Sequence, residues 1–158
     1  MTTVLARRRD ATAGLRHLAS DTAVAALVAG TLGGVPSTLH AIATGRDPLE
    51  AIRAAGTVLG RDDAAPARLL AVGLLVHAAV SGTWALVLVP TLARRAHPIL
   101  VGGVLGAVIG GGARLLAARG FPRLAALPLV PQLADHVAYG ALIGALVRSR
   151  RGRVVDRG

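Results

Sequence analysis

The stretch that decides the fold is residues 69–92, LLAVGLLVHAAVSGTWALVLVPTL, which lies between Arg68 and Arg94 and contains no Asp, Glu, Lys or Arg. A helix rises about 1.5 Å per residue. A charge-free window of this length can therefore cross a hydrocarbon core of ~30 Å. We predict a transmembrane helix over 69–92.

Three further windows have the same character. The four predicted spans are 22–45, 69–92, 97–118 and 124–147. The third contains Arg114 near its end, where a long side chain can reach the headgroups. The fourth is interrupted at its start by Pro128 and Pro131, and Pro131 is tolerated in a first helical turn. The prediction is an all-α fold, a four-helix transmembrane bundle over 22–147, flanked by a basic segment at 1–21 and a basic tail at 148–158.

Composition agrees with this class. The 158 residues are 53% hydrophobic, with a mean hydropathy of +0.59 and one residue each of Trp, Tyr and Phe. So apolar a chain of this size is unusual for a soluble domain, whereas small residues suit helix packing in lipid. Cysteine is absent, which excludes disulfides and thiolate metal sites.

The basic residues predict an orientation. Of the 18, all arginine, eleven fall in the N-terminal segment, the loop between spans two and three and the C-terminal tail, and seven fall on the opposite side, in the other two loops and at the end of the third span. The positive-inside rule then places both termini in the cytoplasm and the protein in the inner (plasma) membrane. The net charge of +10 could also indicate nucleic acid, but the aromatic residues needed for base stacking are missing, so no nucleic-acid partner is predicted. A cleaved signal peptide ending near Ala41–Ala43 is an alternative for the first span.

Small residues recur at four-residue spacing on the later spans. The glycines predicted to pack helices are Gly102, Gly106 and Gly110 on the third span and Gly140 and Gly144 on the fourth. Residues at this spacing share one helix face, and a face without side chains lets backbones approach closely. Two roles remain open: packing within the bundle, and a homo-oligomer interface through the third span.

The first outer loop contains a helix start. Asp47 can cap, Pro48 fits a first turn and Glu50 can complete a capping box. Leu49, Ile52 and Leu59 then fall near one face. We predict a short amphipathic helix lying on the outer leaflet.

Five ionisable side chains lie inside the predicted spans, and their distances from the span ends place them in one layer of the outer half. They are His40, His77, Arg114, Asp135 and His136. Such residues are costly in lipid and usually face the bundle interior. The first span is also broken near Gly34 and Pro36, since proline removes a backbone hydrogen bond, and broken helices often mark transporter sites.

Three interpretations of these side chains remain open. The first is structural, with Asp135 paired to Arg114 and the histidines bonded to backbone or hydroxyl groups. The second is a transport or proton-relay site. The third is a metal or haem site using the three histidines, although their spacing matches no established motif. No nucleophile motif surrounds Ser81, so we predict no enzymatic activity and no resident cofactor.

Four segments carry a family resemblance: Pro36-Ser37-Thr38-Leu39-His40, Gly45-Arg46-Asp47-Pro48-Leu49-Glu50-Ala51, Pro128-Leu129-Val130-Pro131-Gln132 and Ala134-Asp135-His136. In these segments the chain resembles small uncharacterised multipass membrane proteins of actinobacteria. The resemblance implies a helical fold and a membrane location, and it implies neither an activity nor a cofactor. The sequence therefore predicts a small transporter or channel component, or alternatively a structural or regulatory membrane protein without a ligand.

Overall fold

The computed structural model describes residues 18–60 and 62–155, and every regular element within them is a helix. The labelled helices are α2 (Val35–Ala43), α3 (Glu50–Gly56), α4 (Pro66–Leu92), α5 (Pro98–Gly120), α6 (Pro122–Ala125) and α7 (Leu129–Val155). A further helix over residues 18–32, here called the first helix, precedes α2. The predicted all-α fold is confirmed, including the short helix in the loop between the first two spans.

Four helical segments are long and apolar enough to cross a membrane. They are Leu18–Ala43, Pro66–Leu92, Pro98–Gly120 and Leu129–Gly152. Only 17% to 28% of the residues in their apolar windows are buried within the chain, and large side chains such as Leu27 and Leu75 are about 70% exposed. A surface this apolar requires lipid as its solvent. The chain is an integral membrane protein.

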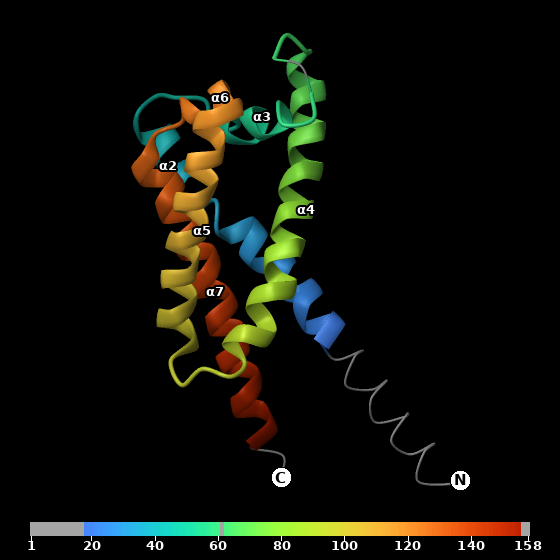
Figure 1. Cartoon of the computed structure of the whole chain (residues 1–158), viewed down its shortest axis with the longest axis vertical. Coiled ribbons are helices and arrows are strands. Elements are labelled where there is room, and N and C mark those ends of the chain that lie inside the picture. Colours follow the sequence, from blue (N-terminus) through green and yellow to red (C-terminus); the bar gives the residue numbers. More distant parts are fainter. Residues whose placement is uncertain (1–17, 61, 156–158) are drawn as a thin grey trace, which may run out of the picture.

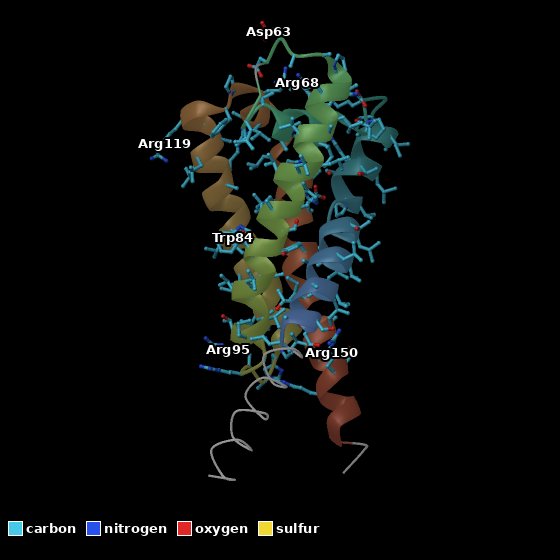
Figure 2. The ribbon with its side chains drawn as sticks, turned by 90° about the vertical axis from the view of Figure 1, so that its right-hand side faces the viewer. Asp63, Arg68, Trp84, Arg95, Arg119 and Arg150 are labelled. Carbon is cyan, nitrogen blue, oxygen red and sulfur yellow. The ribbon has the colours of Figure 1, made fainter. Side chains whose placement is uncertain are left out.

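The bundle has two distinct ends (Figure 1). The first helix begins and α7 ends at one end, here called the terminal end, and α3 and α6 lie at the other, here called the α3–α6 end. Figure 2 shows Arg95 and Arg150 near the terminal end, Asp63, Arg68 and Arg119 toward the opposite end, and Trp84 between them. Charged side chains thus border an apolar middle, as expected at the two faces of a bilayer.

The fourth membrane helix begins later and ends later than predicted. α7 starts at Leu129 and continues to Val155, through the first part of the predicted tail. The predicted start at residue 124 falls instead in the separate helix α6. Pro128 explains the interruption, because a proline disfavours helical geometry in the residue before it. Pro131 lies in the first turn of α7, as expected.

Glycine forms the contact between α5 and α7, the most extensive in the bundle. A Cβ atom added at Gly106 would collide with the carbonyl oxygen of His136, and one at Gly102 with the carbonyl oxygen of Gly140. Likewise, a Cβ atom at Gly144 would collide with the carbonyl oxygen of Pro98. Only residues without side chains permit this approach. All five glycines predicted to pack helices lie at this contact, so α7 of the same chain already covers that face of α5.

A second backbone contact joins α3 to α4. Gly56 approaches the carbonyl group of Leu69, and Gly73 approaches that of Ile52. Ala54 is fully buried beside them. The short helix predicted to lie on the outer leaflet therefore packs on the first turns of α4.

The apolar core occupies the half of the bundle toward the terminal end. It contains Ala25, Ala29, Ala85, Leu88, Val89, Leu92, Ile143 and Val147, contributed by the first helix, α4 and α7. At its edge Arg150 forms an ion pair with Asp21. Arg151 donates hydrogen bonds to backbone carbonyl groups at the end of α4, including that of Leu92 at 3.1 Å. These contacts close the bundle at the terminal end.

Candidate functional site

The first membrane helix is broken at Gly33 and Gly34, where a turn separates residues 18–32 from α2. A helix that starts anew has backbone N–H groups without intrahelical partners. The carboxylate of Asp135, on α7, accepts a hydrogen bond from the Ser37 N–H at 2.8 Å. A negative charge at this position also interacts favourably with the helix dipole. Asp135 of the fourth span is therefore bound to the first membrane helix next to its break.

Polar side chains form a stripe along α7. Gln132, Asp135, His136 and Tyr139 are spaced by three or four residues and so share a face. The His136 Nδ1–H donates to the Gln132 carbonyl oxygen at 2.8 Å, and the Tyr139 hydroxyl donates to the Ser81 carbonyl oxygen at 2.5 Å. The same spacing in the sequence could have identified Gln132 and Tyr139 as members of the site.

His77 joins the group from α4. Its Nε2–H donates to the carbonyl oxygen of Gly30 at 2.8 Å, just before the break in the first helix. Both His77 and His136 lie close enough to Asp135 to interact with it electrostatically. Three of the five predicted ionisable residues therefore lie together around the broken helix.

The other two predicted residues lie elsewhere. Arg114 donates to the carbonyl oxygen of Ala125 at the end of α6, so the expected pair between Arg114 and Asp135 is not formed. The physical reason is that a helix end offers carbonyl oxygens without partners, which arginine satisfies well. His40 lines a cleft at the α3–α6 end. All five side chains are half-buried, and no buried polar cluster unites them.

The cleft has a volume of ≈ 380 Å³ and lies among α2, α3, α6 and the start of α7. Its lining residues are Ser37, His40, Ala41, Arg46, Asp47, Pro48, Glu50, Ala51, Arg123, Ala126, Leu127, Pro128, Pro131 and Gln132. Neither Asp135 nor His77 lines it. The cleft instead reaches Ser37, whose N–H binds Asp135, and Gln132, whose carbonyl binds His136. The polar group around the broken helix therefore begins directly behind the cleft wall.

Ion pairs border the cleft. Arg123 binds both carboxylate oxygens of Glu50, through Nε at 2.8 Å and a terminal nitrogen at 3.0 Å. Arg53 pairs with Asp47, and its Nε lies 4.0 Å from Glu50. The hydrogen bonds from Arg123 hold the pKa of Glu50 below its ordinary value, and Glu50 raises the pKa of Arg123.

The sequence did not predict the pair between Glu50 and Arg123, which joins α3 to α6. It assigned Glu50 to a capping box. The predicted cap at Asp47 is also not formed: α3 begins at Glu50 with Leu49 at the N-cap and no side-chain cap hydrogen bond, and the Asp47 carboxylate accepts the Leu49 N–H at 2.9 Å within the preceding turn.

The histidines do not gather as metal ligands. Within the part of the chain that the structure describes, no three His, Cys, Asp or Glu side chains are placed to hold a metal ion. His40 is directed to the cleft, whereas His77 and His136 use ring N–H groups on backbone carbonyls. The metal and haem interpretation therefore gains no support from the geometry.

Comparison with known proteins adds no assignment. The chain matches no protein-family model, and no curated protein or solved structure is significantly similar to it.

Proposed function

We propose that this protein is a small transporter or channel component that moves an ion or small solute together with protons past Asp135. The observation that carries the proposal is the contact of the Asp135 carboxylate with Ser37 N–H at the break of the first membrane helix, behind a polar cleft. Discontinuous helices whose ends meet a charged group are a recurring feature of transporter sites. An ionisable residue inside a membrane is a functional candidate for the same reason.

The distribution of polarity along the bundle supports a route from one side. Polar groups run inward from the cleft through Ser37 and Asp135 to Tyr139, which reaches the carbonyl of Ser81. Beyond them the apolar core, with Leu92 and Ile143 fully buried, closes the other half. The titratable carboxyl group of Asp135 thus lies between the cleft and this apolar seal. This is the arrangement expected of a transporter open toward one face.

The proposal includes an orientation and a location. The arginine distribution favours a terminal end in the cytoplasm and an α3–α6 end outside the plasma membrane. The cleft would then open to the exterior. The resemblance to actinobacterial multipass proteins stays a prediction, as do a homo-oligomer and the absence of enzymatic activity and of a nucleic-acid partner.

The test is proton flux in vesicles. Purified protein is reconstituted into liposomes that contain a pH-sensitive dye, and a potassium gradient with valinomycin drives protons inward. We expect protein-containing vesicles to acidify faster than empty ones, and Asp135→Asn to reduce the rate to that of empty vesicles. Asp62→Asn serves as a control for a charge change outside the membrane segments, because Asp62 is exposed and does not line the cleft. Equal rates for wild type, Asp135→Asn and empty vesicles would overturn proton movement past Asp135.

A structural or regulatory role without a ligand is the second candidate. It is favoured by the backbone hydrogen bonds of His77, His136 and Arg114, because satisfied polar groups need no further partner. Under this role Asp135→Asn leaves vesicle flux unchanged, and Asp135 matters for folding alone. Measurement of flux and unfolding on the same preparations separates the two.

A further inference from the structure

The cleft contains two opposite kinds of charge, but its acidic residues are already engaged. Asp47 accepts the Leu49 N–H and pairs with Arg53, and Glu50 binds Arg123 through both oxygens. Each carboxylate is thereby neutralised by an arginine of the same protein. Neither is free to attract a cationic ligand.

The polar side chains of the cleft lining that have no partner among the described residues are mainly hydrogen-bond donors. Within residues 18–60 and 62–155, the side chains of His40, Arg46 and Gln132 have no hydrogen-bond or ion-pair partner, although all three line the cleft. Arg46 carries a permanent positive charge and a fork of five N–H donors. Because Asp47 is paired with Arg53 from outside the lining and Glu50 with Arg123, Arg46 is the charged residue of the lining that is left unpaired within the described part of the chain. The unpaired positive charge of Arg46 favours an anionic ligand.

The cleft also has apolar residues in its wall and beside it. Leu127, Pro128 and Pro131 form part of its wall. Nearby, Leu39 and Ile42 of α2 are 60% and 62% exposed, in the segment that the bilayer surrounds. A ligand with an anionic group at Arg46 could therefore place an apolar part along α2 or against the prolines.

We infer that the cleft binds a phosphate group, held by Arg46 with His40 and Gln132 as further donors. Arginine suits phosphate because its planar fork donates two parallel hydrogen bonds. The group can be inorganic phosphate or the headgroup of an anionic phospholipid, and the same donors would serve either. The inference names the ligand class of the cleft in the proposed function, but binding alone does not require transport.

The experiment measures binding to the full chain in a non-ionic detergent. Isothermal titration calorimetry compares inorganic phosphate, dihexanoylphosphatidic acid and dihexanoylphosphatidylcholine. We expect one or both of the first two to bind in the cleft and the zwitterionic lipid to bind at least about tenfold more weakly. Binding of inorganic phosphate identifies a soluble source, and binding of phosphatidic acid alone identifies a lipid source.

Matched arginine variants locate the site. Arg46→Gln should weaken binding about tenfold or more, since a charged hydrogen-bond donor is lost, and His40→Gln should weaken it less. Arg119→Gln is the control, because Arg119 is an exposed arginine of α5 that does not line the cleft. Arg46→Lys keeps the charge, and its intermediate affinity would show that the forked geometry contributes.

Two outcomes would overturn the inference: no binding of either phosphate probe, or equal loss of binding with Arg46→Gln and Arg119→Gln. Phosphate binding without proton flux would leave the inference in place and remove the proposed transport. Proton flux without phosphate binding would overturn the inference and leave the proposed transport in place.

Discussion

Asp135 and Ser37 lie 98 positions apart in sequence, and the carboxylate of one binds the backbone N–H of the other at 2.8 Å. The contact links the fourth membrane helix to the point where the first is interrupted. It gives a carboxylate inside the bundle a favourable partner without a basic side chain. Several expectations about stability and function rest on such contacts between distant segments.

The first prediction separates charge from hydrogen bonding at Asp135. Asn keeps an oxygen that can accept the Ser37 N–H, whereas Leu does not. We expect Asp135→Leu to lower the free energy of unfolding by about 1–3 kcal/mol, the cost of a partly buried donor left unsatisfied, and Asp135→Asn to lower it less. Circular dichroism during SDS titration of detergent-solubilised protein measures the difference. Equal stability of the two variants would contradict this role.

The second prediction concerns the glycine contact of α5 and α7. Gly106→Ala introduces a Cβ atom that collides with the His136 carbonyl oxygen. We expect it to lower the unfolding free energy by about 1–3 kcal/mol, as overpacking does. Gly112→Ala is the control on the same helix, because a Cβ atom there meets nothing within 4 Å. The control should be neutral or stabilising by up to about 1 kcal/mol. A similar loss in both variants would mean that glycine acts only through helix propensity.

The third prediction is a pH dependence of the pair between Glu50 and Arg123. The pKa of Glu50 is lower in the folded protein than in the unfolded chain. Its stabilising contribution is therefore present above the unfolded value and is lost as the pH falls through the folded value. The Glu50 side chain is 37% exposed, so the contribution is at most about 1 kcal/mol. Glu50→Gln should unfold slightly more readily than wild type at pH 7, and the difference should disappear as the pH falls through the folded pKa of Glu50 and the carboxyl group becomes protonated. A difference that persists at acid pH would show that the ion pair is not its cause.

The fourth prediction concerns the terminal end. Arg151 donates to the carbonyl oxygens of Leu92 and Arg95, at 3.1 Å and 2.8 Å. We expect Arg151→Ala to lower the unfolding free energy by about 1–2 kcal/mol, because these carbonyls follow a helix end and lose a charged donor. Arg148→Ala removes an exposed arginine of the same helix and should change stability by less than about 0.5 kcal/mol. Thermal unfolding in detergent compares the two variants. A larger loss for Arg148→Ala would refute the assignment.

Much of the fold could be predicted because lipid imposes simple rules. The charge-free stretch between Arg68 and Arg94 becomes α4, and the glycines at four-residue spacing lie where α5 meets α7. Length, charge and residue size are local properties of a sequence. They are sufficient to define helices that must satisfy their own backbone groups in a membrane.

The contacts of the candidate site were less predictable, because its polar side chains bind backbone atoms. A sequence shows which side chains have opposite charge, and on that basis Arg114 was expected to pair with Asp135. The structure provides the Ser37 N–H instead, and gives Arg114 the carbonyl group of Ala125. Groups of this kind are present at every residue, and only the folded chain shows which helix ends are left open. The pair between Glu50 and Arg123 was missed for a related reason, since a short loop helix had to bridge two distant segments.

The glycine contact between α5 and α7 has a mechanical consequence. Two backbones in direct touch leave no side chain that could rearrange, so these helices can shift against each other only by separating. The same kind of contact joins α3 to α4 at Gly56 and Gly73. Two walls of the cleft, α3 and the start of α7, therefore each belong to a pair of helices whose backbones touch, and the ion pair of Glu50 and Arg123 connects α3 to α6. We expect a ligand to be accommodated by rearrangement of the side chains that line the cleft, with both helix pairs unchanged.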